Sequence, residues 1–172
     1  MKNSIWVNPI ALWVGFIAVS TWLAWQGYVA EAVPYGDVSF IYEFWAAQAA
    51  TGAGTVGIDF PWVYPVVALV PILLPLFAGT SSYAIGWIIL VTALNAGGFA
   101  FLLYSAPKTS RNKLQRHAAW WWLLFLVLLG PIAVARLDSI ITPLAIVGLL
   151  LAGTRPAIAG ALLTVATWIK VS

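Results

Sequence analysis

The sequence contains no cysteine and very few charged residues. Of its 172 residues, 8% are charged and 63% are hydrophobic. Without cysteine, the chain can form no disulfide framework and offers no thiolate to a metal ion. Soluble domains carry about a quarter charged residues, so this chain lacks the polar surface that keeps a protein in water. The composition therefore excludes a soluble globular fold and predicts an integral membrane protein.

Acidic residues are the scarcest of the charged residues, and they are unevenly placed. Four of the five lie between residues 29 and 60: Glu31, Asp37, Glu43 and Asp59. Any carboxylate chemistry is therefore expected in this segment. The formal charge of +3 is the excess of eight basic residues over five acidic ones. In a membrane chain basic residues mark cytoplasmic loops, so we predict no nucleic-acid partner.

Long apolar runs dominate the rest of the chain. Each crossing of a bilayer needs about 20 apolar residues, so the length predicts about six spanning or partly spanning helices. The runs cover residues 9–28, 61–77, 83–104, 118–134, 140–152 and 156–171. The second contains Pro65, Pro71 and Pro75, which predict a kinked or incomplete helix. The fold class is therefore all-α, a polytopic transmembrane helical bundle, with neither an internal repeat nor a soluble domain.

The first apolar run has an alternative interpretation as a cleaved signal peptide. Ala30, Glu31 and Ala32 have the small-x-small form of a cleavage site. The apolar core of a signal peptide is about 7–15 residues, however. This run is longer and contains several tryptophans, so we favour a retained helix.

The acidic outer loop, residues 29–60, is expected to contain an amphipathic surface helix. Apolar residues recur there at helical spacing: Val38, Ile41, Tyr42, Trp45 and Ala49. Asp37 comes directly before them, in the position of an N-cap. Its carboxylate could also act as a general base at the membrane face, and the two roles are compatible.

The sequence GAGTVG, residues 52–57, matches the letters of a dinucleotide-binding fingerprint. That site needs a strand before the glycines and a helix after them. Here a surface helix precedes the glycines, and Asp59 and Pro61 follow them. The match is therefore interpreted as a turn.

Three charged residues near the C-terminal runs are candidates for function. Arg136 and Asp138 interrupt an apolar region, where ionisable residues are costly, and each is the expected partner of the other. Their alternative role is to anchor a helix end at the interface. Lys170 ordinarily extends its ammonium group to the interface, and a phosphate contact is the alternative. His117 is expected at a solvated interface, and no metal site is predicted.

The charge pattern conflicts with a simple count of crossings. If the acidic loop is outside, three full crossings place the basic segment, residues 107–117, outside as well. The positive-inside rule requires that segment in the cytoplasm. Either the proline-rich run 61–77 re-enters without crossing, or the rule is broken. In both cases Arg136, Asp138 and Lys170 share one side if the last two runs both cross.

Several short motifs resemble the start of polytopic GT-C glycosyltransferases, most closely family 87 and its mannosyltransferase relatives. They are GDV at 36–38 with Tyr42 after it, WVYP and ALVP within 62–71, RLD at 136–138, AIAGALLTVAT at 157–167, and Lys170. The resemblance implies transfer of a hexose, mannose first, from a polyprenyl-phosphate donor to a lipid or glycan acceptor. It also implies a cell-membrane location, an active site on the extracytoplasmic face and no cofactor.

The resemblance also implies roles for individual residues. Asp37 would be the general base for the acceptor hydroxyl in an inverting displacement. Arg136 and Lys170 would stabilise the leaving phosphate, and Tyr42 and Asp138 complete the implied substrate-binding set. Leu137 and Asp138 stand where the family often has glutamine and asparagine.

Members of that family are more than twice as long as this chain. The resemblance therefore implies that residues 1–172 are a single membrane domain and the N-terminal part of a longer enzyme. Such a part would be inactive alone and would need its C-terminal half or a partner chain. Two other functions fit the pattern. Proline-broken runs suggest a transporter or flippase subunit, and the short length suggests a non-catalytic assembly partner.

Overall fold

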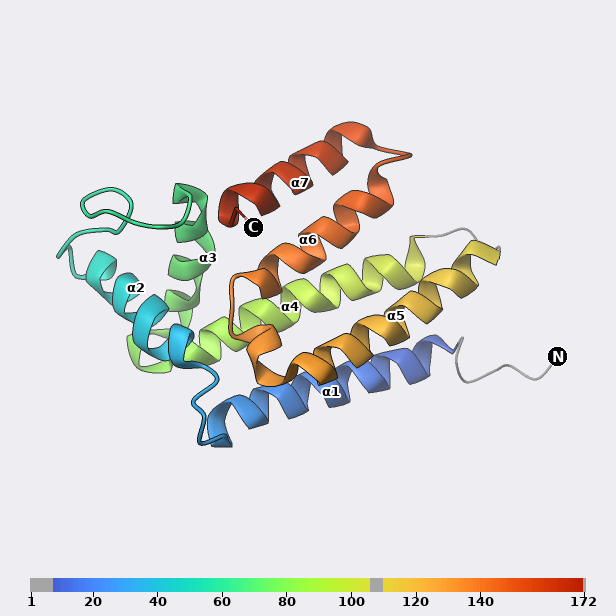
Figure 1. Cartoon of the computed structure of the whole chain (residues 1–172), viewed down its shortest axis with the longest axis horizontal. Coiled ribbons are helices and arrows are strands. Elements are labelled where there is room, and N and C mark those ends of the chain that lie inside the picture. The colour runs from blue at the N-terminus through green and yellow to red at the C-terminus, as the bar shows by residue number, and fades with distance from the viewer. Residues whose placement is uncertain (1–7, 106–109, 172) are drawn as a thin grey trace.

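A computed structural model describes residues 8–105 and 110–171 of the chain (Figure 1). Within these residues the structure is a helical bundle without a β-strand. The all-α fold class is confirmed. The six predicted apolar runs correspond to three long helices and three shorter apolar segments.

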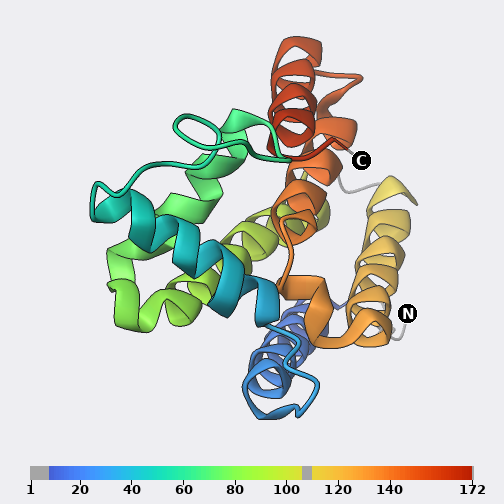
Figure 2. The same cartoon turned by 60° about the vertical axis from the view of Figure 1, so that its left-hand side comes forward.

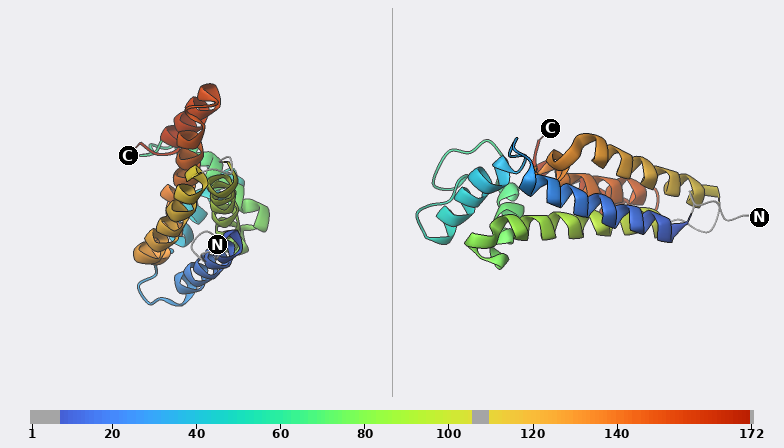
Figure 3. Two further views of the ribbon diagram at one scale, coloured as in Figure 1. Left: turned by 90° about the vertical axis from the view of Figure 1, so that its right-hand side faces the viewer. Right: turned by 90° about the horizontal axis from the view of Figure 1, so that it is seen from below.

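Three helices of the described chain are long and apolar enough to cross a membrane. They are α1 (Pro9–Val29), α4 (Tyr83–Tyr104) with the short turn before it, and α5 (Ser110–Leu129), whose apolar span runs from Lys113 through the following turn to Val134. The three spans have 21, 25 and 22 residues, and about 20 residues at 1.5 Å per residue already reach the roughly 30 Å of a hydrocarbon core. Figure 3 shows the three lying side by side along the long axis of the molecule.

The three long helices share a buried apolar core, yet their outer faces are apolar too. The core joins Leu12 and Phe16 of α1 to Phe99 of α4 and Leu123 of α5. On the outside of α1, Ile10 is 71% exposed. A helix that is apolar on all sides suits a lipid environment rather than water. The chain is therefore a membrane protein.

The last two helices form a short antiparallel hairpin, and the first of them packs on α4. They are α6 (Asp138–Leu151) and α7 (Pro156–Ile169), with 14 residues each. That length corresponds to about 21 Å, less than the roughly 30 Å of a bilayer core. The predicted runs 140–152 and 156–171 thus correspond to two partly spanning helices.

The proline-rich run does not cross the bundle. It forms three short pieces: η3 (Val66–Ala68), α3 (Leu69–Leu73) and η4 (Leu74–Ala78). In Figure 1 the chain leaves α1 and enters α4 at the same end of the bundle, and these pieces pack there beside α4. The prediction of a broken segment is confirmed. This path agrees with the first of the two solutions to the topology conflict, in which the run does not cross (Figure 1).

The two ends of the bundle consequently differ in charge. The connections at one end carry all five acidic residues of the chain, and we call it the acidic end. In Figure 2 the acidic end comes forward, with α2 (Glu43–Ala50) and α3 in front. The opposite end, called the basic end, holds Lys113 and Arg116 in the first turns of α5 and Arg155 in the α6–α7 turn.

The helix predicted in the outer loop is present, but two of its details differ. It begins as a π-helix, η2 (Asp37–Tyr42), and continues as α2. Its buried face consists of Val38, Tyr42 and Ala46, whereas Ile41, expected on that face, is exposed beside Phe40. The predicted N-cap is wrong. Asp37 is the first residue of η2, and no side chain makes a capping hydrogen bond at this helix end. The Asp37 carboxylate contacts Arg136 instead.

The GAGTVG segment forms turns, as predicted. Gly52, Gly54 and Gly57 all have positive φ angles, from 74° to 120°, where a side chain would be strained. The backbone N–H of Thr55 donates to Asp59 Oδ2 at 2.7 Å. The segment is a closed surface turn with no strand before it and no helix directly after it.

Candidate functional site

The candidate site is built around the turn that leads from α5 into α6. The 3₁₀ helix η6 (Gly130–Val134) ends α5, and residues 135–137 then reverse the chain. Ala135 and Leu137 are almost completely buried, with 0% and 1% exposure. Because its two neighbours point into the core, Arg136 extends to the outside of the turn, with its side chain 45% exposed.

Two side chains of α4 donate hydrogen bonds to backbone carbonyls on either side of this turn. The indole N–H of Trp87 donates to the carbonyl oxygen of Val134 at 2.8 Å. The amide Nδ2 of Asn95 donates to the carbonyl oxygen of Ser139 at 2.9 Å. These bonds bracket Arg136 and Asp138, so a helix of the membrane core determines where both charges lie.

Among the described residues, two ion pairs meet at this turn. Arg136 Nη1 contacts Asp37 Oδ2 at the start of η2. Lys170, directly after α7, places its Nζ 2.6 Å from Asp138 Oδ2. The prediction that Arg136 and Asp138 pair with each other is therefore wrong. Each instead bonds a different element, because the turn directs the two side chains toward opposite neighbours.

Tyr42 is also at this turn, but it is 2% exposed. Its ring packs on Trp87 with 5.1 Å between ring centroids. Burial, together with the neighbouring Tyr64 hydroxyl, raises the pKa of Tyr42 above its ordinary value, and the Leu137 backbone amide opposes that shift. The phenol therefore remains protonated and supports the turn from inside. Its predicted role in substrate binding stays a prediction.

All five site residues predicted from the sequence thus lie together at the acidic end. Asp37, Arg136, Asp138 and Lys170 form two linked ion pairs, and Tyr42 packs beneath them. Together the four charged groups sum to zero. The arrangement offers carboxylates that can accept a proton and cations that can offset a developing negative charge.

A groove between α5 and α6 opens next to these charges. It has a volume of about 340 Å³, within the range of about 300–1,000 Å³ that is usual for ligand pockets. Arg136, Asp138 and Asn95 line its polar part, and Phe125 and Ile132 belong to its apolar walls. Asp37 does not line it, but its carboxylate contacts Arg136, which does.

The groove continues along the two helices. A second cavity of about 420 Å³ shares Trp122, Phe125 and Thr142 with the first and extends to Leu128 and Ile146. Asn95 and Thr142 were missed by the sequence analysis. A signal for Asn95 was available, because it is an amide inside an otherwise apolar run, where polar side chains are often functional.

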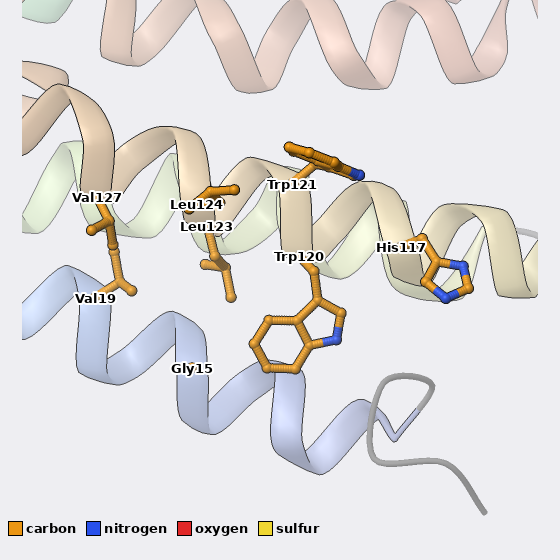
Figure 4. Close-up of a pocket in the computed structure, with 8 residues that line it drawn as sticks. All are labelled: Gly15, Val19, His117, Trp120, Trp121, Leu123, Leu124 and Val127. Atoms are coloured by element: carbon orange, nitrogen blue, oxygen red, sulfur yellow. The ribbon is translucent and has the colours of Figure 1, made fainter.

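A larger groove lies elsewhere, between α1 and α5 (Figure 4). It has a volume of about 500 Å³ and apolar walls that include Val19, Trp120 and Leu123, with His117 toward one end. No carboxylate and no Lys or Arg lines it. We therefore place the candidate site at the ion pairs, where proton transfer and charge stabilisation are both chemically available. His117 is exposed, as expected for an interface residue.

Neither metal ligands nor relatives identify the site further. In the described part of the chain, no three histidine or acidic side chains come together in a way that could hold a metal ion. Comparison of the chain with protein-family models, curated protein sequences and solved structures finds no match. The resemblance to GT-C glycosyltransferases therefore rests on the motifs alone.

Proposed function

We propose that this chain is a membrane glycosyltransferase of GT-C type, or the N-terminal part of one. It transfers a hexose, with mannose as the first candidate, from a polyprenyl-phosphate donor to an extracytoplasmic lipid or glycan acceptor. The observation that carries the proposal is the Asp37–Arg136 pair at the mouth of an apolar groove. Transfer from a lipid-linked phosphate sugar needs an apolar groove for the lipid, then a cation for the phosphate, and beyond it a base for the acceptor hydroxyl.

The distribution of charge supports an extracytoplasmic site. Because basic connections favour the cytoplasm, the basic end of the bundle belongs there and the acidic end belongs outside. Both ion pairs then face the outer leaflet of the cell membrane. The resemblance implies the same side for the reaction.

In the proposed reaction, Asp37 accepts the proton of the acceptor hydroxyl. The hydroxyl oxygen forms a bond to the anomeric carbon, and the bond between that carbon and the phosphate oxygen breaks. The electron pair leaves with polyprenyl phosphate. Arg136 and Lys170 offset the charge that develops on the leaving phosphate, and Asp138 keeps Lys170 in place through its 2.6 Å contact.

The proposal is tested with the purified chain in proteoliposomes that contain polyprenyl-phosphate mannose labelled in the sugar. A labelled glycolipid or glycan product supports a transferase. A flippase is the second candidate, favoured by the groove that extends from Arg136 along α5 and α6. It would move the labelled lipid between leaflets without forming a covalent product. Co-purification with another polytopic chain and no product would indicate an assembly partner.

The proposed orientation is tested with single cysteines, because the chain has none of its own. Ala32→Cys at the acidic end is expected to react with a membrane-impermeant maleimide in intact cells. Leu114→Cys, 70% exposed in the first turns of α5, is expected to react only after the cells are opened. Mass-shift labelling on a gel measures both. The reverse pattern would place the ion pairs in the cytosol and remove the proposed mechanism.

A further inference from the structure

We infer that the α5–α6 groove holds the hydrocarbon chain of a single-chain lipid phosphate, and that its phosphate competes with Asp37 for Arg136. This inference rests on the proposed function and assigns it a donor site. It also adds a property that the proposed function does not contain. Lipid binding releases the carboxylate that is to act as base.

The shape and lining of the groove favour one hydrocarbon chain. Its two cavities lie next to each other between α5 and α6, and Trp122, Phe125 and Thr142 line both of them. Along both cavities the walls are almost entirely apolar, and the charged groups are confined to the end at Arg136 and Asp138. An amphiphile with one chain and an anionic head matches that division.

The charges at the mouth explain why the phosphate and Asp37 compete. Each of the two carboxylates already has one cation, so the four groups leave no surplus positive charge. Of these four charged groups, Arg136 and Asp138 line the groove, whereas Asp37 and Lys170 do not. An anionic headgroup entering there meets Arg136, the cation that Asp37 already contacts. Two anions that contact the same guanidinium weaken each other's binding to it, and this coupling is reciprocal.

The coupling has a consequence for catalysis. Arg136 occupies a lone pair of the Asp37 carboxylate, and an acceptor hydroxyl that approaches Oδ2 must compete for it. When the phosphate engages the guanidinium, the carboxylate is released toward the acceptor. The Asp37 carboxylate is therefore less constrained as a base when the leaving phosphate is in place, because the guanidinium then no longer draws on its Oδ2.

Binding of a long-chain polyprenyl monophosphate to the purified chain in nanodiscs tests the inference without any sugar transfer. Asp37→Asn keeps the shape of the side chain and removes its charge. We expect it to bind the lipid phosphate about fivefold more tightly, the upper range for a partly exposed ion pair. Arg136→Gln is expected to bind about tenfold more weakly or worse, since a charge-assisted hydrogen bond is lost. Equal or weaker binding by Asp37→Asn overturns the competition.

A second pair of variants tests the groove itself. Thr142→Trp places a large ring where the two parts of the groove meet, and we expect it to weaken binding at least fivefold. Thr167→Trp is the matched control. Both threonines are exposed, and both hydroxyls donate to the carbonyl four residues earlier, at 2.8 and 3.0 Å. Thr167 does not line the groove. Equal binding by the two variants overturns the assignment.

Two competitors identify the part of the ligand that is recognised. Inorganic phosphate should displace the lipid only at far higher concentration, and the two-chain lipid phosphatidylglycerol should not displace it. Equal displacement by either overturns the assignment to a single-chain lipid phosphate. The inference and the proposed function fail separately. If Asp37→Asn loses sugar transfer but binds the lipid phosphate as the wild type does, only the competition is rejected. If Asp37→Asn binds the lipid phosphate more tightly but still transfers sugar at the wild-type rate, only the role of Asp37 as base is rejected.

Discussion

Asp37→Asn is expected to lower sugar transfer from polyprenyl phosphate by about 10²–10⁴-fold, the usual contribution of a general base. Asparagine keeps the hydrogen-bonding oxygen that faces Arg136 but cannot accept the proton of an acceptor hydroxyl. The variant should still insert and fold, because an ion pair as exposed as this one contributes less than about 1 kcal/mol. Initial rates with labelled donor, measured at equal amounts of inserted protein, give the comparison.

Glu31→Gln is the matched control for this experiment. Glu31 is an exposed acid in the same outer loop and belongs to neither of the two ion pairs described above. The Glu31→Gln variant should transfer sugar at a rate within about twofold of the wild type, since an exposed substitution away from special features has little effect. Wild-type transfer by Asp37→Asn would show that the carboxylate is not the base, and the proposed mechanism would be withdrawn.

Gly86→Val is expected to have the largest effect on stability. A Cβ atom at Gly86 would lie 2.4 Å from the carbonyl oxygen of Pro75 and 3.1 Å from Ala78 Cβ. Backbone cannot move aside as a flexible side chain does, so η4 must separate from α4. Overpacking of this kind costs about 1–3 kcal/mol. It also strains the nearby bond from the Tyr83 hydroxyl to the Ile72 carbonyl, 2.7 Å long.

Gly97→Val is the control, because Gly97 lies on the same helix and a Cβ there meets no atom within 4 Å. Both substitutions change helix propensity equally, and only one disturbs packing. In detergent, the melting temperature of Gly86→Val should fall below that of Gly97→Val by about 2–4 °C per kcal/mol for a chain of this size. Equal melting temperatures would mean that η4 is not held against α4 at this position.

The membrane character of the chain was predictable because it depends on composition and local pattern. Apolar length alone predicted the three long helices, and Pro71 and Pro75 predicted that the run between α1 and α4 is broken. A proline removes a backbone donor wherever the chain folds. These properties act within one or two helical turns, so a linear reading captures them.

The partners of the charged residues were not predictable in the same way. Sequence proximity suggested that Arg136 pairs with Asp138, but Arg136 pairs with a residue 99 positions away. The burial of Ala135 and Leu137 directs the Arg136 side chain outward, and that burial depends on contacts with other elements. A pairing of this kind exists only after the helices have packed.

The sequence by itself determined that this chain is an all-helical membrane protein whose acidic residues gather in one loop and one turn. Tertiary structure alone decided that residues 61–78 return to the end where they began, that Asp37 meets Arg136, and that a groove separates α5 from α6. The physical reason is the range of the interactions. Hydrophobicity and backbone propensity act on neighbouring residues, whereas a close approach such as that of η4 to Gly86 arises only between distant segments that have already packed.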